Sequence, residues 1–155
     1  MKAETLPEPV RRLLAHPLDM TPVLENFYNQ KLCLAVSRSE RNGNTYLREV
    51  VLKLANQSRA VAYGVIQIHL DNLPATAKNL VLAERRPFGS ILGTENVPHT
   101  SAPQAFFRAG ADPHIRAFLE LDQPAELFGR FNILRSTSGP PLAEVIEFLA
   151  PINPS

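Results

Sequence analysis

The chain has 155 residues, of which 45% are hydrophobic and 20% are charged, and its formal net charge is +1. This length and balance predict one globular domain, residues 1–155, with a hydrophobic core of its own. The 16 lysine and arginine residues are dispersed along the chain, so neither composition nor charge indicates a nucleic-acid-binding surface.

The first half of the chain predicts one helix followed by strands. Asp19-Met20-Thr21-Pro22 is typical of a helix start, with the helix opening at the threonine and proline at its first position. Short polar turns between the apolar runs that follow indicate antiparallel neighbours. The strands are expected at residues 32–37, 45–54 and 60–70, with turns at residues 40–44 and 56–58.

The second half mixes helices with further strands. Helices are expected at residues 75–84 and 90–92, and strands at residues 128–136 and 142–149. Gly93, Pro98 and Pro103 predict a loop over residues 93–104. Residues 113–121 fit a helix or a strand equally well. Together these elements predict an α+β fold with one antiparallel sheet.

Cysteine usage and the N-terminus indicate the compartment. Cys33 is the only cysteine, which excludes an internal disulfide and fits a reducing environment. Its neighbours Leu32 and Leu34 predict a buried structural thiol in preference to a nucleophile. The N-terminus has no signal-peptide pattern, and no apolar run approaches the roughly 20 residues that span a bilayer. We therefore expect a cytoplasmic protein without a membrane span.

Arg48 is the unusual residue of the strand expected at residues 45–54. Alternate side chains of a strand point to opposite faces. Arg48 therefore shares a face with Tyr46, Val50, Leu52 and Leu54, which should look into the core. A guanidinium keeps its proton there and is costly to bury without an anion. Either a protein carboxylate or a ligand must supply that anion.

Two glutamates in the last expected strand could be the partner. Glu144 lies on one face of residues 142–149 and Glu147 on the other, and both have apolar neighbours. Periodicity alone does not choose between them. A buried ion pair with Arg48 is the commoner arrangement for such charges. The functional alternative is that both groups line a polar pocket and hold opposite ends of a small ligand.

Metal and covalent chemistry have little support. The four histidines show no metal-ligand spacing, and a surface or capping role is expected for His16, His69, His99 and His114. The sequence contains no glycine-rich phosphate loop and no serine nucleophile elbow. We therefore expect no metal and no cofactor.

Several motifs, in a common order, resemble those of chorismate lyase, the small enzyme that converts chorismate into 4-hydroxybenzoate and pyruvate. They are Asp19-Met20-Thr21, Tyr46-Leu47-Arg48-Glu49, Arg86-Pro87-Phe88-Gly89, Arg116-Ala117-Phe118-Leu119-Glu120, Leu127-Phe128-Gly129-Arg130, and Ser138-Gly139-Pro140-Pro141 leading to Glu147-Phe148-Leu149. Each motif is weak alone, but together they cover most of the chain.

The resemblance implies an antiparallel sheet of about six strands, with helices forming lids over an enclosed pocket. It implies that Arg48 and Glu147 contact the substrate as catalytic residues. It also implies that the backbone amides of Met20 and Phe88 bind the substrate carboxylate. Phe88 stands where the family has an aliphatic residue, a change that a backbone contact should tolerate.

The position of the glutamate departs from the family pattern. The spacing from Gly139 to Glu147 is one residue longer than in the family, and counting from Ser138-Gly139 would select Ile146. Only a carboxylate preserves the chemistry, so Glu147 is the predicted residue and Glu144 the fallback.

The implied activity is the elimination of pyruvate from chorismate without a cofactor. Aromatisation drives this reaction, so the protein mainly has to hold one conformer in a dry site. Arg48 would pair with a carboxylate, and Glu147 would accept a hydrogen bond from the ring hydroxyl and assist proton movement if burial raises its pKa. Arg116 and Arg130 are candidates for the second carboxylate, although surface salt bridges explain them equally well. The product 4-hydroxybenzoate would serve ubiquinone, plastoquinone or another phenolic pathway of a bacterial cell, and a monomer is expected.

The main alternative is the related ligand-sensing domain of bacterial transcription regulators, which binds a small effector and catalyses nothing. Such domains normally follow a DNA-binding winged helix, and the segment before Arg48 is too short to hold one. A third possibility is a non-catalytic interaction module in which Arg48 and Glu147 form a core ion pair.

Overall fold

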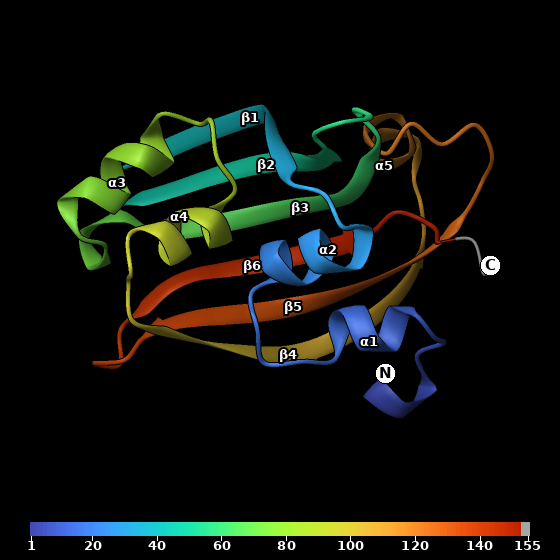
Figure 1. Ribbon diagram of the computed structural model, residues 1–155, viewed down its shortest axis with the longest axis horizontal. Coiled ribbons are helices and arrows are strands. Elements are labelled where there is room, and N and C mark those ends of the chain that lie inside the picture. Colours follow the sequence, from blue (N-terminus) through green and yellow to red (C-terminus); the bar gives the residue numbers. More distant parts are fainter. Residues whose placement is uncertain (153–155) are drawn as a thin grey trace.

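A computed structural model describes residues 1–152, which form one six-stranded antiparallel sheet with short helices (Figure 1). The order of the strands across the sheet is β1-β2-β3-β6-β5-β4. Their bounds are β1 Leu32–Asn42, β2 Thr45–Leu54, β3 Ala60–His69, β4 His99–Gly110, β5 Glu126–Ser136 and β6 Pro141–Leu149. All neighbouring strands pair antiparallel. The predicted α+β class with a single antiparallel sheet is confirmed.

Helices cover the two faces of this sheet unequally. Four lie over one face (Figure 1): α1 Val10–Leu14, α2 Met20–Tyr28, α3 Ala75–Leu82 and α4 Phe88–Thr94. The fifth, α5 Pro113–Phe118, packs on the opposite face with Tyr63 and Phe148, and two 3₁₀ turns lie at Ala3–Thr5 and Leu70–Asn72. Most of the buried apolar side chains lie between the sheet and α1–α4, where the site described below is found.

The central strands agree well with the sequence expectations. The predicted strand at residues 45–54 is β2, and the strand predicted at residues 60–70 ends at His69. β1 is longer than predicted, because its pairing with β2 continues to Asn42↔Thr45. The two-residue connection contains Gly43 at φ 62°, a left-handed conformation that glycine adopts without strain.

The starts of α2 and α5 differ in their N-capping. α2 begins at Met20, one residue before the predicted threonine, and the Asp19 side chain at the N-cap makes no capping hydrogen bond. The ambiguous segment at residues 113–121 contains a helix, α5. The Asp112 carboxylate accepts a hydrogen bond from the Ile115 amide at 2.8 Å, and Pro113 occupies the first turn.

The loop predicted at residues 93–104 is wrong in its second half. β4 begins at His99 and pairs with β5 along its whole length. β4 is an edge strand, and Pro103 sits where the register shifts between Pro103 and Ala105. Proline is tolerated at such positions, because one side of an edge strand has no hydrogen-bonded neighbour. The helix α1 was not predicted either.

The prediction that Cys33 is buried is also wrong. Its thiol is exposed, with Sγ 3.5 Å from the Lys53 carbonyl oxygen. Cys33 pairs in register with Lys53 and so points to the face opposite α1–α4, on the edge strand β1. The adjacent Leu32 is buried on the other face of the strand. The apolar residues next to Cys33 therefore did not predict the position of the thiol itself.

Candidate functional site

The strand register brings polar and apolar side chains into two adjacent rows on the face covered by α1–α4. Residues that pair across antiparallel strands share a face of the sheet. Following the register from β2 through β3 and β6 to β5, the first row is Arg48, Ile66, Val145 and Asn132, and the second is Val50, Gly64, Glu147 and Arg130. Charged groups therefore reach the interior from β2, β6 and β5, with apolar side chains between them.

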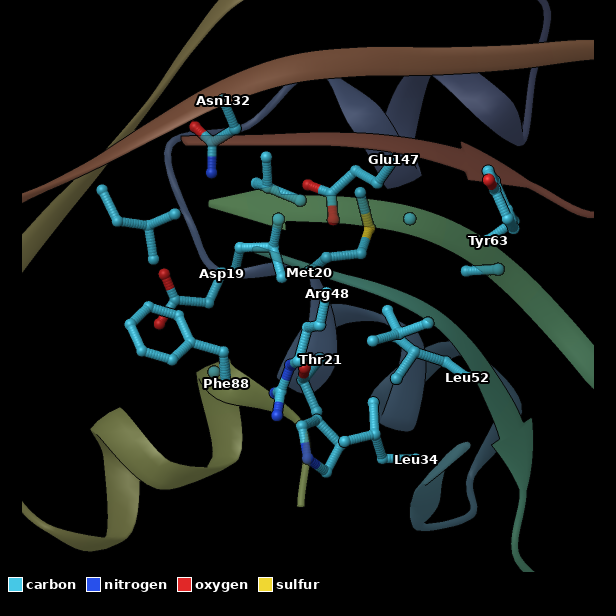
Figure 2. Close-up of a pocket in the computed structure, with 18 residues that line it drawn as sticks. Asp19, Met20, Thr21, Leu34, Arg48, Leu52, Tyr63, Phe88, Asn132 and Glu147 are labelled. Carbon is cyan, nitrogen blue, oxygen red and sulfur yellow. The ribbon is translucent and has the colours of Figure 1, made fainter. Parts of the chain in front are cut away.

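A cavity lies between these rows and the N-terminal ends of α2 and α4. Its empty volume is about 610 Å³ including its opening to solvent, and its wall is mostly apolar. The four residues predicted from the family resemblance, Met20, Arg48, Phe88 and Glu147, all border this cavity (Figure 2). Residues far apart in the chain therefore meet at one cavity.

The approach of the two helix ends depends on Gly89. A Cβ atom built at this glycine would lie 3.1 Å from Thr21 Oγ1 and 3.3 Å from Asp19 Cβ. A larger residue would require the Thr21 or Asp19 side chain, or the start of α4, to shift by a few tenths of an ångström. This close contact lies at the cavity wall, since all three residues border the cavity.

Arg48 is buried to 1% exposure without a carboxylate partner among residues 1–152. Its Nη1 donates to the Val81 carbonyl at 3.4 Å and its Nη2 to the Arg86 carbonyl at 3.2 Å. Nε has no hydrogen-bond partner among the described atoms. Burial lowers the pKa of the guanidinium. A full positive charge in this position is incompletely compensated by the protein.

The carboxylate that acts on the charge of Arg48, Glu84, already has a hydrogen-bond partner. The Tyr46 hydroxyl donates to Glu84, and this hydrogen bond lowers the pKa of the glutamate. Glu84 acts on Arg48 through the electric field without a direct ion pair. The protein therefore provides a favourable potential at Arg48, while the guanidinium stays available to another anion.

The buried ion pair considered from the sequence forms, but with a different arginine. Glu147 Oε1 accepts from Arg130 Nε at 2.9 Å, because β5 and β6 are neighbours and the two residues pair in register. Burial raises the pKa of Glu147, and the positive charge of Arg130 opposes that rise. Arg130 also donates to the carbonyls of Leu14, His16 and Leu18 at 3.3, 3.0 and 2.9 Å. Arg130 thus holds the segment before α2 in place, and its charge is paired with Glu147.

Glu144 and Arg116 lie away from the cavity. Glu144 pairs in register with Gln67 and points to the opposite face of the sheet, where its Oε2 lies 2.7 Å from His69 Nε2. Arg116 is on α5, also on that face, and donates to the Asp122 carbonyl at 3.2 Å. Of the two glutamates left open by periodicity, the structure thus brings Glu147 to the cavity.

Two residues that border the cavity were not singled out from the sequence. Asp19 Oδ2 lies 2.7 Å from His99 Nε2, while Oδ1 is buried without a partner. Asn132, 1% exposed, donates from Nδ2 to Ser101 Oγ at 2.7 Å, and its Oδ1 has no partner. Strand alternation could have indicated Asn132, which shares the inner face of its strand with Leu134. No comparable signal was available for the partner of Asp19.

Three of the four histidines contact carboxylates, which the sequence did not predict. His69, His99 and His114 each contact a carboxylate at 2.7 Å. His16 fits the expected capping role, since its Nε2 lies 2.6 Å from the Leu13 carbonyl in the last turn of α1. Within residues 1–152, no three histidine, cysteine, aspartate or glutamate side chains gather as metal ligands. In the same part of the chain, none of the helices has the length and apolar character needed to cross a bilayer.

Comparisons with known proteins place the fold among transcription-regulator domains. No protein-family model and no curated protein sequence matches the chain. PhnF from Mycobacterium smegmatis superposes with a TM-score of 0.64 at 10% identity, covering 84% of this chain and 63% of PhnF. Its effector domain alone gives 0.62 at 10%, covering 84% and 87%. The ligand-binding domain of a putative GntR-family regulator from Bordetella bronchiseptica gives 0.58 at 11%, covering 79% and 90%.

The match corresponds to one part of the larger regulators. The chain spans 58% of the possible transcriptional regulator YydK from Bacillus subtilis, with a TM-score of 0.59 at 11% identity, and 63% of PhnF, but most of the separate effector and ligand-binding domains. At such identities the likeness shows the fold alone. The neighbours named here are described as transcriptional regulators or as their effector or ligand-binding domains.

Proposed function

We propose that this chain is a small-molecule-binding domain whose cavity takes a ligand with a carboxylate group. The observation that carries the proposal is the guanidinium of Arg48, which borders the cavity and pairs with no carboxylate of residues 1–152. An arginine fork matches a carboxylate and binds it through two parallel hydrogen bonds. The similarity to proteins described as effector and ligand-binding domains supports a binding role.

The order of the strands suggests how the ligand lies. Arg48 on β2 and Asn132 on β5 are in one row but three strands apart, so their backbones are separated by roughly 14 Å. The apolar side chains of Ile66 and Val145 lie between them. A ligand with a carboxylate at the Arg48 end and an apolar ring or short hydrocarbon in the middle would match this sequence of surfaces.

A second candidate function is chorismate pyruvate-lyase activity. The observation that favours it is that the cavity brings together Arg48, Glu147, Met20 and Phe88, the residues implied by the resemblance to that enzyme. Arg48 would hold one carboxylate of chorismate, and Glu147 would accept a hydrogen bond from the ring hydroxyl. The raised pKa of Glu147 would help it to exchange a proton during the elimination. The apolar walls would restrain the substrate in a reactive conformer.

Incubation of the purified protein with chorismate, with no metal or cofactor added, tests both proposals. Formation of 4-hydroxybenzoate and pyruvate in equal amounts, above the spontaneous rate and lost in Arg48→Met, would support the lyase. Arg48-dependent binding of chorismate or benzoate, without product, would support a binding domain that catalyses nothing. If calorimetry detects no Arg48-dependent binding of either carboxylate, the anion-binding proposal is wrong.

A further inference from the structure

The β5 side of the cavity presents hydrogen-bond acceptors without matching donors. Asp19 and Asn132 border the same cavity, and the Oδ1 atom of each is buried without a partner among the described atoms. Glu147, on the neighbouring strand β6, uses Oε1 for Arg130, and within residues 1–152 no donor contacts its Oε2. Figure 2 shows these three side chains around the cavity. Buried polar atoms are paired in the great majority of cases, so such a group of acceptors is unusual.

The donors closest to these acceptors have other partners in the structure. Ser101 donates its hydroxyl to the Leu18 carbonyl at 3.3 Å and accepts from Asn132 Nδ2 at 2.7 Å. In this orientation of the Asn132 amide, its oxygen has no partner. His99 Nε2 is occupied by the other oxygen of Asp19, and Arg130 by Glu147 and backbone carbonyls. His99 Nε2 and the Arg130 guanidinium therefore have other partners than Asp19 Oδ1 and Asn132 Oδ1.

The placement of Asp19 gives a second, independent indication. Aspartate at an N-cap position normally accepts a hydrogen bond from an amide of the first helical turn. Asp19 occupies the N-cap of α2, yet its side chain makes no capping hydrogen bond. One carboxylate oxygen contacts His99 instead, and the other is buried without a partner in a residue that borders the cavity. Asp19 therefore borders the cavity without capping α2.

We propose that Asp19 and Asn132 form a donor-selective subsite, which binds a hydroxyl or amine group on the ligand at the end opposite its carboxylate. This inference rests on the proposed function, since Arg48 must hold the carboxylate end. A ligand hydroxyl or amine would supply hydrogens to acceptors that otherwise remain unpaired in a buried site. Ligands with an apolar group at that end would leave these acceptors unpaired and bind less tightly.

Calorimetric titration with matched benzoates tests the subsite. The probes are 4-hydroxybenzoate and 4-fluorobenzoate, which are similar in size but differ in the hydrogen-bond donor. We expect the wild-type protein to bind 4-hydroxybenzoate at least about ten-fold more tightly, the value of one hydrogen bond to a buried acceptor. Asp19→Ala and Asn132→Leu should each reduce this preference to less than about three-fold while preserving the affinity for 4-fluorobenzoate. Asp71→Ala, at an exposed position, serves as the control and should leave both affinities unchanged.

The outcomes separate this inference from the function on which it rests. Equal binding of the two benzoates by the wild-type protein, or a preference that survives in both variants, would overturn the subsite and leave the anion-binding function in place. Loss of all benzoate binding in Arg48→Met, together with a donor preference that disappears in the two subsite variants, would support both. Absence of any benzoate binding by the wild-type protein would overturn both proposals.

Discussion

Replacement of Arg48 by methionine should abolish ligand binding without weakening the folded protein. Methionine keeps much of the apolar volume of the arginine stem and removes the charge. The charge is buried to 1% exposure and has no carboxylate partner within residues 1–152, so its removal relieves a desolvation cost of several kcal/mol. This position should therefore be one where function opposes stability.

The hydrogen bonds that Arg48→Met removes are weak. Both are long, at 3.4 and 3.2 Å, and together they contribute about 2–3 kcal/mol at most. The Val81 carbonyl also keeps its hydrogen bond from the Glu84 amide at 3.1 Å. Since this cost and the relief of desolvation are similar in size, we expect the free energy of unfolding of the ligand-free protein to be unchanged or to rise by up to about 2 kcal/mol.

Urea unfolding and thermal melting, each with and without ligand, provide the assay. A carboxylate ligand at 100 times its dissociation constant should stabilise the wild-type protein by about 2.7 kcal/mol. For a chain of this size that corresponds to a rise in melting temperature of roughly 5–10 °C. Arg48→Met should show no such rise.

Arg130→Met is the matched control, because it also removes a buried arginine from the same face of the sheet. Arg130 has a carboxylate partner and three backbone acceptors, and its loss would strand the buried Glu147. We expect its free energy of unfolding to fall by about 3–5 kcal/mol. If Arg48→Met destabilises the ligand-free protein as much as Arg130→Met does, Arg48 is a structural residue. If Arg48→Met keeps the ligand-induced rise in melting temperature, the anion binds elsewhere.

Three other predictions concern neighbouring groups. Burial raises the pKa of Glu147, so near this pKa the folded protein binds more protons than the unfolded chain. The free energy of unfolding should therefore fall as the pH rises above 4.5, the ordinary pKa of a glutamate, and urea unfolding of Glu147→Gln at several pH values should lack this fall. Despite the cost of burial, hydrogen bonds from Tyr63, His114 and Ser37 lower the pKa of Glu49 to about 2. The stability that ionised Glu49 contributes should therefore be lost as the pH falls from 4.5 towards 2. In urea unfolding, Glu49→Gln should lower the free energy of unfolding by on the order of 2 kcal/mol at neutral pH and should weaken its dependence on pH in acid. Gly89→Ala should weaken ligand binding in calorimetry more than it changes the melting temperature, because its Cβ crowds Thr21 and Asp19, which border the cavity. Unchanged affinity would contradict this role of the glycine.

Local patterns predicted the centre of the sheet well. Alternation and turn residues identified β2 and all of β3, because short turns with recognisable sequences bound these strands. β4 was not identified, since its prolines are typical of a loop and only its edge position makes them compatible with a strand. The prediction that Cys33 is buried failed for a related reason. The thiol lies on the edge strand β1, on the face of the sheet opposite α1–α4.

The sequence by itself determined that a charge would lie on the inner face of β2, because the two-residue period of a strand assigns Arg48 to the same side as its apolar neighbours. It also identified Glu147 as one of two glutamates near the core. Only the tertiary structure decided which charges meet. β3 separates β2 from β6, whereas β5 lies beside β6, so the carboxylate pairs with Arg130 and Arg48 is left without it. Strand order depends on the packing of segments far apart in the chain, and local periodicity contains no information about it.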